Sequence, residues 1–167
     1  YLHSAFDHTT YQDPLGIQLG NKKPADEFHS DEEHKIDINL SGQDAAGFYS
    51  QLSNIGNPLA NYDDMTSEYI DNINFINGME VTATNYAERI SAVFNAGSNA
   101  VTYPQFDLAD QLKTVAKMIS GGSKTKIFLL RIDGFDNHAN QVDSQNSSHL
   151  GKHADLLTEL SESIKAF

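Results

Sequence analysis

Residues 124–141 read KTKIFLLRIDGFDNHANQ, an apolar run that gives way to a polar segment at Asp133. The apolar side chains show no alternation with polar ones; they are Ile127, Phe128, Leu129, Leu130 and Ile132. A strand that is buried on both faces of a parallel sheet has this pattern. We therefore expect residues 126–132 to form a central, buried strand that leads into a polar loop.

Helical patterns flank this strand on both sides. Apolar residues at helical spacing precede it, namely Leu108, Leu112, Val115, Ala116 and Ile119. Asp107 is expected to cap this helix and Gly121-Gly122 to end it. A second amphipathic pattern follows the polar loop, with Leu156, Leu157, Leu160, Ile164 and Phe167. The order helix, turn, strand, loop, helix predicts one unit of an α/β layered fold.

The first part of the chain has a different character. Residues 1–62 are punctuated by proline and glycine, and they predict an irregular arm with short strands at GIQL (16–19) and KIDINL (35–40). A short helix is expected at residues 41–54. Residues 63–167 hold the helices and the central strand, including a helical zone at 65–96 that Gly78 interrupts. We interpret residues 1–167 as one domain or part of one.

The composition limits the classes of partner. With 23 acidic and 11 basic residues the chain has a net charge of -12, which repels nucleic acid and anionic lipid. No apolar run approaches the roughly 20 residues that a transmembrane helix needs. The absence of cysteine from the sequence excludes disulfides and thiolate metal sites, and it is compatible with the cytosol or with export.

The polar loop carries the candidate chemistry. Asp136 and His138 are two residues apart, so in an extended loop their side chains lie on the same side. A carboxylate and an imidazole are a common ligand pair for Zn²⁺ or Mn²⁺. Asp133, His149 and His153 are weaker candidates for the further ligands of such a site. The last two would share one face if residues 149–153 were helical.

Two other interpretations of this region remain open. The loop resembles a calcium site only superficially, because Phe135 stands where an EF-hand requires an oxygen ligand. A polar loop after a buried strand also needs no ligand at all. Since His153 falls on the apolar stripe of the last helix, a structural, partly buried histidine is the simpler explanation for it.

Three segments resemble a known bacterial family. They are YPQFDLADQLKTVAKMISGG (103–122), DGFDNH (133–138) and HADLLTELSESIKAF (153–167). In order, they are similar to the helix, the G-G-F-D-T-H loop and the final helix of the family called domain of unknown function 1501. Asp133 replaces the first glycine of that loop and Asn137 replaces its threonine. The segments YQDPLGIQLG (11–20) and GFYSQLS (47–53) also resemble the family's middle region.

The resemblance implies an exported protein, whether periplasmic, cell-surface or extracellular, with the layered fold of alkaline phosphatases and sulfatases. It implies that Asp136 and His138 bind a divalent metal, Zn²⁺, Mn²⁺ or Ca²⁺, and that the protein hydrolyses phosphate or sulfate esters. The family's other characteristic loops, of the form G-G-N-D-G and G-T-D-H-G, are not in these residues. We therefore expect an internal fragment whose partners are the remainder of the same polypeptide or a larger cell-surface assembly. The alternative is a catalytically inactive binding or structural protein that keeps the fold.

Overall fold

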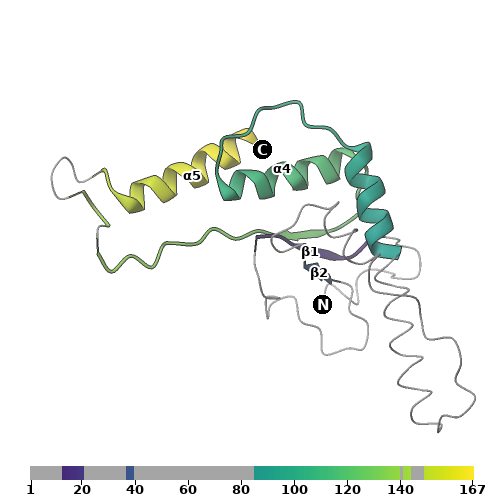
Figure 1. Cartoon of the computed structure of the whole chain (residues 1–167), viewed down its shortest axis with the longest axis horizontal. Helices are drawn as coiled ribbons and strands as arrows, with labels where there is room; N and C mark the ends of the chain where they lie inside the picture. Colours follow the sequence, from purple (N-terminus) through teal and green to yellow (C-terminus); the bar gives the residue numbers. More distant parts are fainter. Residues whose placement is uncertain (1–12, 21–36, 40–84, 140, 144–148) are drawn as a thin grey trace, which may run out of the picture.

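The computed structural model describes residues 13–20, 37–39, 85–139, 141–143 and 149–167. Three short strands form one parallel sheet in the order β2-β1-β3, with β1 at Gly16–Gln18, β2 at Asp37–Asn39 and β3 at Ile127–Leu129. Residues 85–96 are helical, and the other helices are α4 at Asp107–Ser120 and α5 at Lys152–Ala166. Figure 1 shows α4 and α5 on the same side of the sheet. The chain is thus a mixed α/β protein with a parallel sheet, as the sequence predicts.

The core lies between the sheet and two helices. Ile17 and Leu19 come from β1 and the residue after it, and they pack against Ile90 and Val93 of the 85–96 helix. The α4 residues of this cluster are Val115 and Met118, and partly buried Tyr86, Phe94, Phe128 and Leu130 lie against it. The register places Ile17 beside Phe128, so both strands present apolar side chains to the same helices.

The expected position of β3 is wrong in one respect. Residues 126–132 were predicted to form a central strand, but β3 covers three of these residues and lies at the edge of the described sheet, paired with β1 alone. Its side chains are half-buried rather than buried on both faces. Phe128 contacts the core, whereas Ile127 and Leu129 lie on the opposite face of the strand. An unbroken apolar run therefore identified the strand and its parallel pairing, but not its place in the sheet.

The N-terminus of α4 is not capped as expected, whereas its C-terminus ends as expected. Phe106 is the N-cap and Asp107 is the first helical residue, so Asp107 does not cap the helix. The Leu108 N–H instead donates to the Glu159 carboxylate of α5, 3.4 Å away. At the other end, Gly122 has a φ of 89° and Ser123 N–H donates to the Met118 carbonyl, as in a Schellman motif. The Gly-Gly stop is thus confirmed.

The other expectations for the helices and the arm are met where they can be compared. The helical zone ends at Ala96, and both strand-like segments of the arm form strands, each of three residues. The rest of the arm, the short helix at 41–54 and the zone at 65–84 lie outside the described residues. No helix in the described part of the chain has the length and apolarity needed to cross a membrane.

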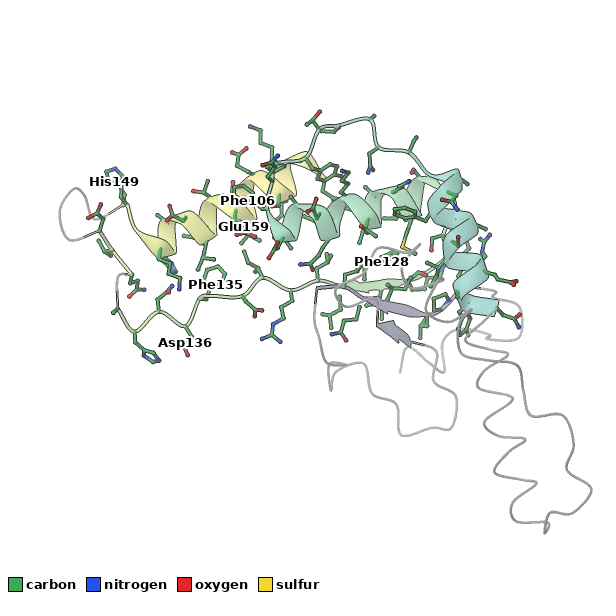
Figure 2. The ribbon with its side chains drawn as sticks, in the orientation of Figure 1. Phe106, Phe128, Phe135, Asp136, His149 and Glu159 are labelled. Carbon is green, nitrogen blue, oxygen red and sulfur yellow. The ribbon has the colours of Figure 1, made fainter. Side chains whose placement is uncertain are left out.

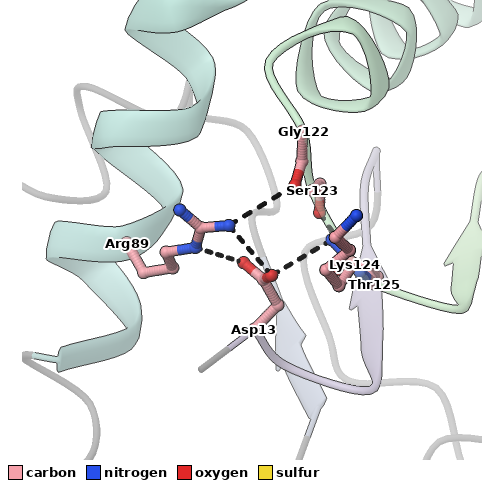
Figure 3. Close-up of polar contacts among 6 residues, drawn as sticks. All are labelled: Asp13, Arg89, Gly122, Ser123, Lys124 and Thr125. Carbon is pink, nitrogen blue, oxygen red and sulfur yellow. Dashed lines mark hydrogen bonds and ion pairs between the residues drawn. The ribbon is translucent and has the colours of Figure 1, made fainter. Parts of the chain in front are cut away.

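A buried carboxylate ties the start of β1 to the helical layer. The Asp13 side chain is 5% exposed and accepts hydrogen bonds from Arg89 Nε at 2.7 Å and Nη2 at 3.2 Å (Figure 3). It also accepts the Lys124 backbone N–H at 3.1 Å, while Arg89 Nη2 reaches the Gly122 carbonyl at 3.4 Å. The hydrogen bond with Asp13 raises the pKa of Arg89 above its usual range, against the effect of partial burial. One carboxylate therefore joins three segments that are far apart in sequence.

Replacing Asp13 by alanine should lower the free energy of unfolding by about 2 kcal/mol. Breaking a fully buried pair costs about 3–5 kcal/mol, but the Arg89 side chain is 33% exposed and can be rehydrated. Urea unfolding of the two proteins measures the difference. Asp13→Asn, which keeps one acceptor, should lose less; equal losses for both variants would show that the charge alone matters.

Candidate functional site

The polar loop starts where α4 holds the end of the β3 segment. Gln111 of α4 donates from Nε2 to the Arg131 carbonyl at 2.9 Å and accepts the Arg131 N–H on Oε1 at 3.0 Å. Its carboxamide thus occupies both hydrogen-bonding groups of one residue, as a neighbouring strand would. Gly20, with a φ of 74°, passes so close that a Cβ there would overlap the Gln111 side chain. Gln111 therefore fixes the carboxyl ends of β1 and β3 relative to α4.

Sequence reasoning missed Gln111. Nothing in its spacing separates it from the other polar residues of an amphipathic helix. Only the tertiary structure shows which of them lies above the end of the sheet, where functional groups of open parallel sheets gather.

Asp136 and His138 meet at the outer side of the loop. The distance from Asp136 Oδ1 to His138 Nε2 is 3.1 Å, and the two side chains are 87% and 90% exposed. The Asn137 N–H donates to the Phe135 carbonyl at 2.9 Å, the hydrogen bond of a γ-turn centred on Asp136. The expected convergence of the two side chains is confirmed, although a tight turn rather than an extended backbone brings them together.

The separation of these two atoms suits a metal site. With metal–ligand bonds of about 2.0–2.2 Å, neighbouring ligand atoms lie about 2.8–3.1 Å apart in octahedral coordination and about 3.3–3.6 Å apart in tetrahedral coordination. The 3.1 Å between Asp136 Oδ1 and His138 Nε2 is close to the octahedral spacing. It is also the distance of the direct ion pair between the two side chains, so both must turn toward a metal to bind it. Both are exposed, so an ion, water and a substrate can reach them. Here the residues fit a divalent metal as two ligands of its coordination shell.

Asp133 lies in a different contact. Its Oδ1 is 2.6 Å from Arg131 Nε, in an ion pair whose side chains are 72% and 53% exposed. Such an exposed pair contributes at most about 1 kcal/mol. As placed, Asp133 neutralises its neighbour Arg131 and is not brought to the Asp136–His138 pair.

The two later histidines do not form the pair that their spacing suggested. Since α5 begins at Lys152, His149 precedes the helix and cannot share a helical face with His153. Figure 2 shows His149 well apart from Asp136. The His153 ring contacts the Phe135 ring edge-to-face, with centroids 5.8 Å apart and the planes at 81°. Within the described ranges, the structure brings no three His, Cys, Asp or Glu residues into a metal-binding group.

The geometry defines a small parallel α/β unit with an Asp–His pair after its β3 strand. Comparisons with protein-family models, with curated proteins and with solved structures found no match. What the protein does must therefore be inferred from the residues themselves.

Proposed function

We propose that this chain belongs to a metal-dependent hydrolase of phosphate or sulfate esters, in which Asp136 and His138 supply two metal ligands. The observation that carries the proposal is the 3.1 Å separation of Asp136 Oδ1 and His138 Nε2 on an exposed turn after β3. A carboxylate oxygen and an imidazole nitrogen at this distance are close enough to bind one Zn²⁺ or Mn²⁺ ion in place of their direct contact.

The fold supports the finer assignment to the alkaline-phosphatase and sulfatase superfamily. Those proteins place their metals at the carboxyl edge of a layered α/β sheet, and here the pair follows the carboxyl end of a parallel strand. The motifs at 103–122, 133–138 and 153–167 resemble the domain of unknown function 1501 family. On this proposal the protein is exported, and other segments of the polypeptide complete the ligand set.

In the proposed site the metal would polarise the ester and stabilise the charge that develops on it. Asp136 is placed at the apex of the turn, so its carboxylate projects into solvent toward an incoming ion. His138 offers Nε2 to the same point, and its imidazole must be neutral to bind. The contribution of this chain is therefore to hold two ligands in place on an accessible surface.

The test is an assay of the whole natural polypeptide that contains this sequence. We expect hydrolysis of p-nitrophenyl phosphate or p-nitrophenyl sulfate in the presence of Zn²⁺, Mn²⁺ or Ca²⁺, lost with a chelator and restored by the metal. Protein that hydrolyses neither ester with any of these ions would contradict the proposal.

A binding or structural protein that keeps the fold is the second candidate. The observation that favours it is an exposed apolar stripe on the outer side of α5 and at its end. Leu157, Ile164 and Phe167 are 46%, 57% and 54% exposed, and their spacings of seven and three place them on one helical face. Such a stripe is typical of a surface that another protein segment covers. An intact protein that binds no metal but loses a partner on mutation of this stripe would support this candidate.

A further inference from the structure

The polar loop has an inner side that rests on α5 and an outer side that carries Asp136 and His138. Figure 2 shows Phe135 directed toward α5 and Asp136 on the opposite side of the segment. A Cβ at Gly134 would lie 3.5 Å from Leu156 Cδ2, so the backbone there is in contact distance of the helix. The loop is thus laid along the first turns of α5 and exposes its candidate ligands on the other side.

His153 is an α5 residue whose ring contacts Phe135, the residue directly before Asp136. Its ring lies edge-to-face with Phe135, an arrangement worth about 0.5–1.5 kcal/mol between aromatic rings. Its backbone N–H donates to the Gln141 carbonyl at 3.2 Å, which ties it to the returning part of the loop. The His153 Nδ1 atom is buried and has no hydrogen-bond partner among the described residues.

Phe135 is itself the first residue of the turn that carries Asp136, so the His153 contact affects the position of that turn. The Phe135 carbonyl accepts the Asn137 N–H that closes this turn, so the position of Phe135 sets the position of its apex. Asp136 is that apex, and His138 follows one residue after the turn. A displaced Phe135 would let the turn open and the two ligand atoms separate.

We infer that His153, through Phe135, is a positioning residue for the Asp136–His138 pair and is not itself a metal ligand. This inference rests on the proposed function, because it assigns the pair a metal. Loss of a residue that orients metal ligands costs about 10- to 100-fold in metal affinity. The relevant property of the His153 side chain is its ring shape, since the ring contacts Phe135 and its Nδ1 has no hydrogen-bond partner among the described residues.

The test compares His153→Ala with His153→Phe, which keeps a flat ring but has no metal-binding nitrogen. Calorimetric titration of the whole natural polypeptide with Zn²⁺ and with Mn²⁺ gives the affinity. We expect a loss of about tenfold or more in His153→Ala and near-wild-type affinity in His153→Phe. Glu162→Ala, at an exposed position of the same helix, is the control, and its affinity should be unchanged.

A second measurement, made without metal, separates this inference from the proposed function. Hydrogen exchange of the Asn137 amide reports the closed turn, because that N–H is bonded to the Phe135 carbonyl. Protection should fall about 2- to 10-fold in His153→Ala, the equivalent of the lost ring contact, and persist in His153→Phe. Equal loss of metal affinity in both variants would make His153 a ligand and overturn the inference. Unchanged protection in His153→Ala would overturn it as well, whether or not the protein binds metal.

Discussion

An Asp136→Ala, His138→Ala double variant should lose divalent metal binding, with the dissociation constant for Zn²⁺ or Mn²⁺ rising at least about 100-fold. The two atoms lie 3.1 Å apart and are almost fully exposed. On the proposed function they supply two metal ligands, which alanine cannot replace. Because the side chains are exposed and make no contribution to the core, the variant should fold normally. Metal content by inductively coupled plasma mass spectrometry and affinity by calorimetry measure the effect.

A matched control exists in the same region. Asp133→Ala, His149→Ala removes the same two residue types from exposed positions outside the pair. Its affinity should stay within about twofold of the wild type, since surface substitutions away from a site usually matter by about 0.5 kcal/mol or less. Equal losses in both double variants would indicate general electrostatic attraction of cations to an acidic protein. Wild-type protein that binds no metal would contradict the assignment outright.

The sequence predicts the meeting of Asp136 and His138 but not the backbone that produces it. The prediction assumed an extended loop, in which residues two apart lie on the same side, whereas the structure brings the pair together by a γ-turn centred on Asp136. The pairing of His149 and His153 depended on a helix boundary, and such boundaries are uncertain by one or two residues. The start of α5 at Lys152 removed that pairing.

Tertiary contacts set the features that the sequence could not predict. Gln111 hydrogen-bonds the Arg131 backbone because the first turns of α4 lie over the end of the β3 segment. Glu159 accepts the Leu108 N–H because α5 packs beside α4. Neither role leaves a periodic signal in the sequence. The edge position of β3 is a similar case, since an apolar run reports burial of side chains but not which strands flank it.

The crossing of the 85–96 helix and α4 depends on two glycines. Gly97 and Gly121 follow the two helices, and each donates its N–H to the last turn of its own helix, at 3.0 Å from Val93 O and Lys117 O respectively. A Cβ on Gly97 would overlap the Lys117 carbonyl, and a Cβ on Gly121 would overlap the Val93 carbonyl. The close approach is therefore reciprocal. Each glycine lies against the carbonyl that accepts the N–H of the other glycine.

Hydrogen bonds around this crossing prevent an easy adjustment. Ser120 Oγ accepts the Ser98 N–H at 3.0 Å and donates to the Ser98 carbonyl at 2.8 Å. The Asn99 side chain donates to the Lys113 carbonyl at 3.1 Å. Moving the helices apart to admit a methyl group would lengthen these bonds and open the core between Val93 and Met118.

Gly97→Ala and Gly121→Ala should each lower the free energy of unfolding by about 3 kcal/mol or more, the upper end of the usual cost of overpacking. The obstacle in both cases is backbone, which cannot rotate away as a side chain would. Gly121 has a φ of -80°, so the cost there is steric and not conformational. Urea unfolding followed by circular dichroism measures each loss.

Gly122→Ala is the control that separates these causes. A Cβ at Gly122 meets no atom within 4 Å, but its φ of 89° is unfavourable for alanine, which costs about 1–2 kcal/mol. The three variants should therefore rank with Gly122→Ala as the mildest, although it alone has a left-handed backbone. If Gly122→Ala were the most damaging, the helix stop rather than the helix crossing would limit stability. The order of the three losses in unfolding free energy thus shows whether the helix crossing or the helix stop holds α4 in place. The position of α4 in turn sets where Gln111 binds the Arg131 backbone at the start of the polar loop.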